Sequence, residues 1–190
     1  MITSPQSGRG EVVLHEKDGT RRVIATDASP EVPPAPSPDG RMVAYLARGI
    51  TVAAMDGTGS RALTGLCCGS ESLISPLAWS PDSSGVAFIH YGDVRVAAAD
   101  GSGDRILVPE ASAPAWSADG RLAVIDESIT RPDGLLHLTL QLIGTGGERR
   151  SILDGGPAML VMNPKWAPNG RLIAVAVNPA GLRPPLPPIP

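Results

Sequence analysis

The chain has 190 residues and a formal net charge of −3, which is enough length for one domain with a real hydrophobic core. This near-neutral charge argues against a nucleic-acid partner, for which a strongly basic surface is expected. The 22 glycines and 20 prolines are numerous but gather between short apolar runs, which indicates a turn-rich chain rather than a disordered one.

Residues 1–10 are polar and are expected to be a disordered N-terminus. They lack the apolar run of a signal peptide, and no later run is long enough for a transmembrane helix, so no membrane partner is predicted. As written, the chain is therefore expected in the cytoplasm. If an upstream segment is missing, a periplasmic or extracellular location remains open.

The first predicted elements are two strands, at residues 11–15 and 21–25, joined by a turn around Asp18 and Gly19. The Asp-Gly pair is a strong hairpin signal, because glycine adopts the left-handed backbone that such turns require. This type of turn recurs at residues 56–59 and 100–103, and in a decayed form at residues 144–147.

A second type of turn recurs roughly every 40 residues and starts from one slot, occupied by Pro36, Trp79, Trp116 and Trp166. After the slot come Ser or Ala, Pro or Ala, and then an Asp or Asn, mostly followed by glycine. Asp and Asn in such turns hydrogen-bond to the backbone two residues later. Because the three tryptophans share one slot, we expect them to lie in the core.

The best-preserved repeat, residues 76–109, contains four short apolar runs between these turns, which predicts an antiparallel meander of four strands. We label its strands a to d: residues 78–80, 86–90, 94–98 and 105–108. The other repeats place strands at residues 42–46, 51–55 and 61–64, at 122–125, 135–143 and 150–153, and at 165–166 and 172–177. A single sheet of this kind cannot bury both of its faces, so the repeats must stack on one another.

The predicted fold is all-β, a β-propeller of four-stranded antiparallel blades with about four blade-equivalents. It comprises three whole blades, an N-terminal half-blade with strands c and d, and a C-terminal half-blade with strands a and b. The propeller spans residues 11–178, and residues 179–190 form a proline-rich tail or linker.

The two half-blades are complementary, which leaves two interpretations open. Residues 12–14 could pair with residues 172–177 and close a ring, which would satisfy both strand edges. Alternatively, the chain is a fragment of a larger propeller, with its ends far apart and its open blade edges available for self-association.

The repeat resembles the WD40-like PD40 repeat of TolB-type β-propellers over residues 11–178. The resemblance rests on the pattern Pro-x-Trp-Ser-Pro-Asp-Gly-Arg, a hydrophobic strand, and then Asp-Gly-Ser/Thr-Gly before Arg-x-Leu. It implies a propeller fold, but blades of this type serve as scaffolds, transporter accessories, sensor domains and gating domains of peptidases. Family members usually have six blades or more, which this chain does not hold.

No catalytic, cofactor-binding or metal-binding residues are predicted. His15, His90 and His137 lie in different repeats without the spacing of a metal site, unlike propeller lyases that hold a metal over the central channel. The recurrent turn residues Asp39, Asp82, Asp119 and Asn169 are explained by backbone hydrogen bonds, with calcium binding as an alternative. Three arginines follow the turn glycine and are expected to pair with turn carboxylates: Arg41, Arg121 and Arg171.

Two further segments carry no assigned role. The adjacent Cys67 and Cys68 are interpreted as free thiols in a connection between blades, with a strained redox pair as the alternative. Residues 182–188 resemble a polyproline II ligand, or else form part of a tail.

The function expected from the sequence is a non-catalytic, TolB-like scaffold that binds a protein or a ligand, with a protein partner favoured. The most variable loops, at residues 67–75, 128–134 and 155–163, are the expected recognition surfaces. The alternatives are a gating or accessory propeller of a serine peptidase, or a small propeller hydrolase or lyase.

Overall fold

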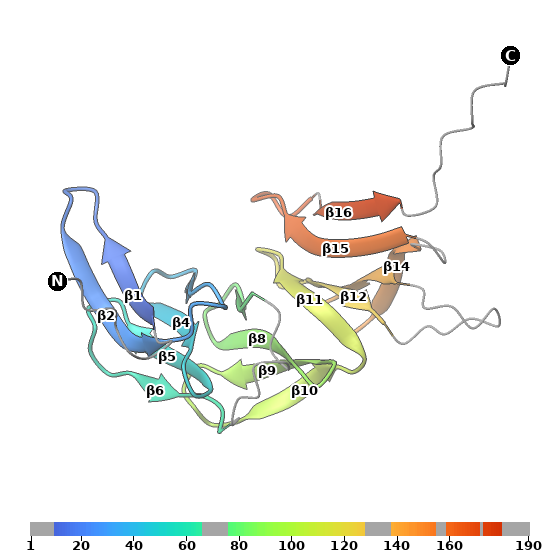
Figure 1. The fold of residues 1–190 in the computed structure, drawn as a ribbon. Coiled ribbons are helices and arrows are strands. Elements are labelled where there is room, and N and C mark those ends of the chain that lie inside the picture. Colours follow the sequence, from blue (N-terminus) through green and yellow to red (C-terminus); the bar gives the residue numbers. More distant parts are fainter. Residues whose placement is uncertain (1–9, 66–75, 128–137, 155–158, 172, 180–190) are drawn as a thin grey trace, which may run out of the picture.

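The computed structural model describes residues 10–65, 76–127, 138–154, 159–171 and 173–179. These residues form sixteen β-strands, all in antiparallel sheets that follow one another along an open arc (Figure 1). Within this described part the chain has no helix, and so none that could cross a membrane. The all-β prediction, with four-stranded antiparallel sheets as its unit, is confirmed.

Three sheets are complete blades in which each strand pairs with the next along the chain. Blade 2 contains β3 (Ala35–Pro36), β4 (Met42–Leu46), β5 (Ile50–Ala54) and β6 (Arg61–Ala62). Blade 3 contains β7 (Ala78–Trp79), β8 (Gly85–His90), β9 (Asp93–Ala98) and β10 (Asp104–Val108). Blade 4 contains β11 (Ala111–Trp116), β12 (Leu122–Asp126), β13 (Thr139–Ile143) and β14 (Arg149–Asp154).

Two half-blades flank the complete ones, as the repeats predicted. Blade 1 consists of β1 (Gly10–His15) and β2 (Arg21–Ala28), and blade 5 of β15 (Met159–Trp166) and β16 (Ile173–Pro179). Among the described strands, β1 pairs only with β2 and β16 pairs only with β15.

Of the two alternatives left open by the sequence, the one with a closed ring, in which residues 12–14 would pair with residues 172–177, is therefore wrong. Figure 1 shows blades 1 and 5 at opposite ends of the arc. The rotation between neighbouring blades is set by close packing of their faces. Five sheets at that rotation do not bring the last back to the first.

Other departures concern element boundaries. Strand β15 begins at Met159, so residues 159–163, which were expected to belong to a loop, are strand. In the hairpin at residues 144–147, the left-handed position is taken by Gly147, whose φ of 86° is close to the 84° of Gly57 in blade 2. The loops at residues 67–75 and 128–134 lie outside the described residues, as do Cys67 and Cys68.

One side chain closes the turn between the first two strands of a blade. The Oδ1 atom of Asp39 accepts a hydrogen bond from the backbone N–H of Arg41 at 3.0 Å, and Asp82 accepts one from Ser84 at 3.1 Å. Asn169 in blade 5 accepts the equivalent bond at 3.0 Å. The prediction of backbone hydrogen bonding is confirmed for Asp39, Asp82 and Asn169, and the asparagine accepts the same bond as the two aspartates.

Blade 3 departs from the other blades within this turn. Gly40, Gly120 and Gly170 have φ angles of 71°, 87° and 67°, but in blade 3 the left-handed position is taken by Ser83, with φ at 59°. Gly85, the glycine of this turn segment, opens strand β8 and is buried. A serine in this conformation carries a strain that glycine does not.

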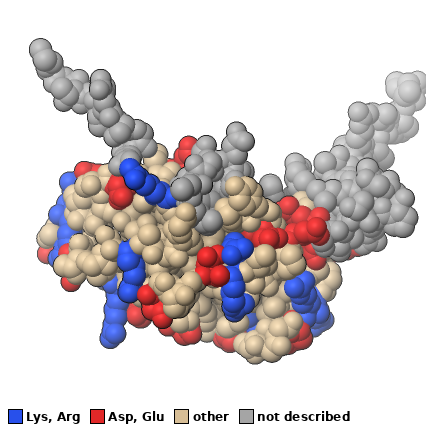
Figure 2. All heavy atoms as spheres, turned by 90° about the horizontal axis from the view of Figure 1, so that it is seen from below, with Lys and Arg blue, Asp and Glu red and all other residues tan. Residues whose placement is uncertain are grey.

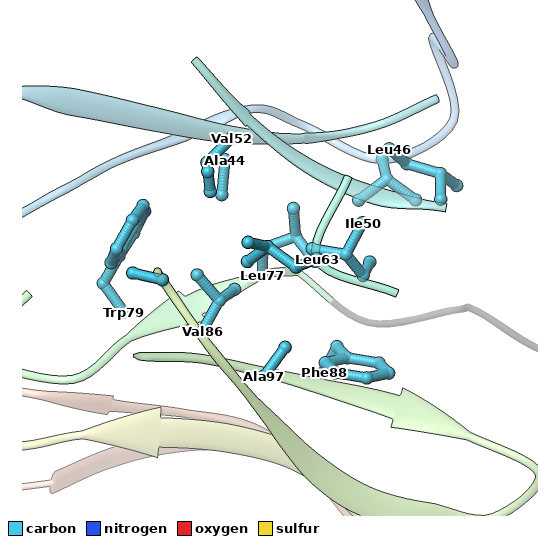
Figure 3. Packing of buried hydrophobic residues seen from close by; sticks show 12 residues of the cluster. Ala44, Leu46, Ile50, Val52, Leu63, Leu77, Trp79, Val86, Phe88 and Ala97 are labelled. Atoms are coloured by element: carbon cyan, nitrogen blue, oxygen red, sulfur yellow. The ribbon is translucent and has the colours of Figure 1, made fainter. Parts of the chain in front are cut away.

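The largest hydrophobic cluster lies between blades 2 and 3. Figure 3 shows Ala44, Ile50 and Val52 of blade 2 facing Val86 and Phe88 of blade 3. Phe88 and Val86 are both 0% exposed. Alternation of side chains along each strand directs these residues to one face, where two sheets share a single core.

Candidate functional site: a groove between blades 3 and 4

A groove with a volume of about 920 Å³ lies between blades 3 and 4, which are neighbours along the arc. Its blade 3 wall includes the turn after β7, part of β9 and the β9–β10 hairpin, and its blade 4 wall includes Trp116 and the turn after β11. The lining is mixed: Val96, Leu107 and Trp116 supply apolar surface, while Asp82 and Asp119 supply carboxylates.

The groove lies where blade 3 lacks two large side chains. When the turns of the four repeats are aligned, Ser84 stands where the other three repeats have an arginine. Gly85 replaces the Met42 and Leu172 that blades 2 and 5 carry. Both Ser84 and Gly85 line the groove. The small residues therefore leave space beneath the tryptophan of blade 4.

Neighbouring blades are joined by a hydrogen bond from the repeated tryptophan at two interfaces but not at the third. The Nε1 atom of Trp79 donates to the Ala35 carbonyl of blade 2 at 2.8 Å, and that of Trp166 donates to the Ala115 carbonyl of blade 4 at 2.9 Å. The Nε1 atom of Trp116 is buried and has no hydrogen-bond partner in the described part of the chain. Its ring is thus not held by the bond that fixes the other two.

The interface between blades 4 and 5 shows what occupies the equivalent space. The Nε atom of Arg121 donates to both carboxylate oxygens of Asp119 at 3.0 Å, and the guanidinium lies 4.8 Å from the Trp166 ring centroid. Its Nη2 atom donates to the Gly170 carbonyl at 2.5 Å. A turn carboxylate, an aromatic face and a turn carbonyl thus hold one guanidinium. The sequence predicted that the repeat arginines pair with turn carboxylates, and Arg121 and Asp119 form such an ion pair.

Two of the lining carboxylates, Asp82 and Asp119, have a lowered pKa and are charged at neutral pH. Hydrogen bonds from the Ser80 and Ser84 hydroxyls, at 2.6 and 2.8 Å, hold the pKa of Asp82 below its usual range. The Arg121 side chain, and after it the Ser117 hydroxyl, lower the pKa of Asp119 to about 2. Hydrogen bonds to the charged form are the main cause at both sites.

The ion pairs around the groove distinguish Asp82 from its neighbours. Asp104 pairs with Arg95 at 2.6 Å and Asp119 with Arg121 at 2.8 Å. Within the described residues, no ion pair joins Asp82 to a basic side chain, although hydroxyls surround it. Over the face seen in Figure 2, basic and acidic side chains are interspersed, so the charges act locally and not as one broad field.

The residues considered from sequence do not gather into one site. His15 is exposed on β1, and His90 is half-buried on β8 with its ring centroid 4.2 Å from that of Tyr91. His137 lies outside the described residues, as do residues 182–188. Among the described residues, no three His, Cys, Asp or Glu side chains come together as a metal site would require.

The tryptophan prediction is correct in its main point. Trp79 is buried, with 7% of its surface exposed, whereas Trp116 and Trp166 are half-buried. Sequence reasoning missed the groove, although a signal was present. The sequence Asp-Ser-Ser-Gly at residues 82–85 is the one turn of this type that departs from the Asp/Asn-Gly-Arg pattern, and the groove lies there.

No family model and no curated protein sequence matches the chain. Solved structures do match it. TolB from Acinetobacter baumannii has 22% sequence identity and a TM-score of 0.60, over 90% of this chain and 43% of that chain. A putative TolB from Agrobacterium tumefaciens has 15% identity and a TM-score of 0.52, over 90% of this chain and 78% of that chain.

A third similar structure is an oligogalacturonate lyase from Vibrio parahaemolyticus, with 16% identity and a TM-score of 0.56, over 85% of this chain and 52% of that chain. At these identities the likeness establishes the fold alone, which is that of TolB-type β-propeller proteins. The chain spans about half or less of the length of this lyase and of the Acinetobacter TolB.

Proposed function

We propose that the chain is a non-catalytic β-propeller scaffold that binds a protein partner in the groove between blades 3 and 4. The observation that carries the proposal is the groove itself, about 920 Å³ in volume, with apolar and charged walls. A segment of several residues fits in a space of this size. The assignment of the repeats to the PD40 type of TolB-like propellers is part of the same proposal.

The walls of the groove suit recognition because strands and tight turns hold them. The β8 and β9 strands pair in register from Gly85 to His90, and the β9–β10 hairpin is closed by a bond from the Ala98 N–H to the Gly103 carbonyl at 2.9 Å. A preformed site loses little conformational entropy when it binds. This rigidity supports a docking role for the groove.

Obstruction of the groove tests the proposal. Ser102 is exposed in the β9–β10 hairpin and lines the groove, so Ser102→Trp should block entry without disturbing the core. Thr20 occupies the same turn position in blade 1, where Asp18 accepts its N–H as Asp100 accepts that of Ser102, so Thr20→Trp is the matched control. In a pull-down from the native host, the partners retained by the wild type and by Thr20→Trp should be lost with Ser102→Trp. Equal retention by both variants would refute the groove as the docking site.

A second candidate is a lyase, because one similar structure is an oligogalacturonate lyase. That likeness concerns the fold, and a lyase role would make the groove or the channel a saccharide site. Incubation of the purified protein with oligogalacturonate, with and without added divalent metal, followed by ultraviolet detection of unsaturated product, separates the two candidates. Turnover above that of a heat-treated sample would favour the lyase and count against the scaffold.

Self-association through open blade edges belongs to the same proposal. In the described residues, β1 and β16 each pair on one side only, and unpaired edge groups favour pairing with another chain. Light scattering over a hundredfold range of protein concentration should show a rising mean mass. A constant monomer mass over that range would contradict the prediction.

A further inference from the structure

The interface between blades 4 and 5 contains a guanidinium site with three parts. Arg121 pairs with the carboxylate of Asp119, its cation lies over the Trp166 ring, and it donates to the Gly170 carbonyl. Two of these groups belong to blade 5 and one to blade 4, so the arginine joins the blades. Planar bidentate pairing and stacking on an aromatic ring are what distinguish arginine from lysine as a ligand.

The interface between blades 3 and 4 contains the same three groups one repeat earlier. Asp82 is the turn carboxylate of blade 3, while Trp116 and Gly120 of blade 4 occupy the positions of Trp166 and Gly170. All three line the groove. The arginine is absent, because Ser84 stands in its position. The interface between blades 3 and 4 therefore retains the three groups of a guanidinium site without a guanidinium from this chain.

We propose that the groove binds an arginine side chain of a partner protein, which takes the place that Arg121 occupies at the next interface. The incoming guanidinium pairs with Asp82, lies against the Trp116 ring and donates to the Gly120 carbonyl. This inference rests on the proposed function, since it names the chemistry by which the partner is recognised.

The charges in the groove favour one arginine within a segment of mixed charge. Asp104 and Asp119 already pair with arginines of this chain, which leaves Asp82 as the lining carboxylate that has only hydroxyl and N–H partners among the described residues. Arg105 on β10 also lines the groove and repels a uniformly basic segment. The groove is far larger than a guanidinium, so it holds neighbouring residues of the partner as well.

A pair of small probes tests the chemistry directly. N-acetyl-arginine amide and N-acetyl-citrulline amide have almost the same shape, but only the first carries a charge. Binding is followed by calorimetry and by the NMR signal of the Trp116 indole N–H. The arginine probe should bind with a dissociation constant of about 1 mM, a reasonable value for a ligand of its size, and the citrulline probe about tenfold or more weakly.

Matched substitutions locate the probe. Asp82→Asn removes the charge, and the turn is retained because Asn169 closes the same turn in blade 5. It should weaken the arginine probe about tenfold or more. Asp39→Asn makes the same change in the turn of blade 2 and should leave binding unchanged. Ser84→Arg supplies the missing guanidinium from within the chain and should abolish binding.

The outcomes separate this inference from the proposed function. Any of three outcomes would overturn the arginine site. The two probes could bind equally, or Asp39→Asn could weaken binding as much as Asp82→Asn does. The third outcome is no binding of the arginine probe at a concentration 20 times the expected dissociation constant of about 1 mM. A partner that is lost with Ser102→Trp but retained by Asp82→Asn would overturn the arginine site while leaving the scaffold function intact. A partner that Ser102→Trp retains would refute the scaffold proposal whatever the probes do.

Discussion

Where blade 3 meets blade 2, the Trp79 indole donates to the Ala35 carbonyl, and the N–H of Asp39 donates to the Ser83 hydroxyl at 3.2 Å. A cluster of twelve buried residues fills the space between the two sheets. Among the described residues where blade 3 meets blade 4, the buried cluster has five members, the Trp116 indole N–H has no hydrogen-bond partner, and a groove is present. One blade thus forms a closed interface on one side and an open one on the other.

The difference shows that a repeated residue does not have a repeated role. Trp79 and Trp116 occupy the same slot, but the residues facing each tryptophan come from the preceding blade. Trp79 meets a blade that carries Arg41 and Met42, whereas Trp116 meets one that carries Ser84 and Gly85. The neighbour therefore decides whether the tryptophan joins two blades or lines a groove.

The largest expected effect comes from the closed interface. Phe88→Ala should lower the free energy of unfolding by about 3–5 kcal/mol, because Phe88 is fully buried in the cluster between blades 2 and 3. Leu107→Ala, at the open interface, should cost about 1–2 kcal/mol because Leu107 is only half-buried. Urea unfolding measures both. Equal costs would remove the contrast between the two interfaces.

The tryptophan bond should distinguish the interfaces next. Trp79→Phe removes the bond to the Ala35 carbonyl, while Trp116→Phe removes no hydrogen bond within the described residues. Once the difference in buried area is subtracted, Trp79→Phe should lower the free energy of unfolding by about 0.5–1.5 kcal/mol more than Trp116→Phe does. The same unfolding experiment measures the difference, and a larger loss at Trp116 would reverse the interpretation of the two sites.

Ser83 permits a test of strain at the closed interface. Ser83→Ala keeps the left-handed backbone and loses the bond from the Asp39 N–H, which should cost about 0.5–1.5 kcal/mol. Ser83→Gly loses the same bond but relieves the strain, so it should be about 1 kcal/mol more stable than Ser83→Ala. If alanine is tolerated as well as glycine, the backbone at residue 83 is not strained.

Ser84→Arg should close the open interface. A new guanidinium between Asp82 and the Trp116 ring should raise the melting temperature by about 1–3 °C, as expected for one exposed cation–π contact in a chain of this size. Ser84→Gln has a long polar side chain without the charge and serves as the control in thermal unfolding. A glutamine variant as stable as the arginine variant would show that the charge is not involved.

The smallest effect is a pH dependence at the interface between blades 4 and 5. The pKa of Asp119 is about 2 in the folded protein, below the ordinary value of 3.8. The carboxylate of Asp119 therefore stabilises the fold fully above the pKa that it has in the unfolded chain. This contribution is lost as the pH falls from about 4 to about 2. Thermal unfolding of the wild type and of Asp119→Asn over this range should differ slightly in slope, because Asp119 is exposed. Parallel curves would mean that the ion pair does not contribute to stability.

Most of the strands could be predicted, because their signals are local. The limits of β4 were predicted to the residue, and those of β8, β9 and β10 differ by a single residue at the first position. Strand β15 was missed at its start because Asn163, with φ at 52°, and Pro164 interrupt the alternation of side chains. Turn residues of this kind normally end a strand, but here they form a bulge within one.

The candidate site was harder to predict, because it depends on residues from two blades. Ser84 and Gly85 looked like ordinary turn variants, and Trp116 looked like another core residue. These residues matter because Trp116 lines the same groove as Ser84 and Gly85. The groove brings together residues more than 30 positions apart, and the repeat pattern within one blade carries no information about it.

The sequence by itself determined the four-stranded blade, its hairpins and the two half-blades. Alternating apolar residues and Asp-Gly turns act over a few positions, and each turn is held by hydrogen bonds between near neighbours. The tertiary structure decided that the arc stays open and that one interface of blade 3 is closed while the other forms a groove. These outcomes depend on how the faces of whole sheets pack, and that packing is set by the combined shape of side chains from two blades.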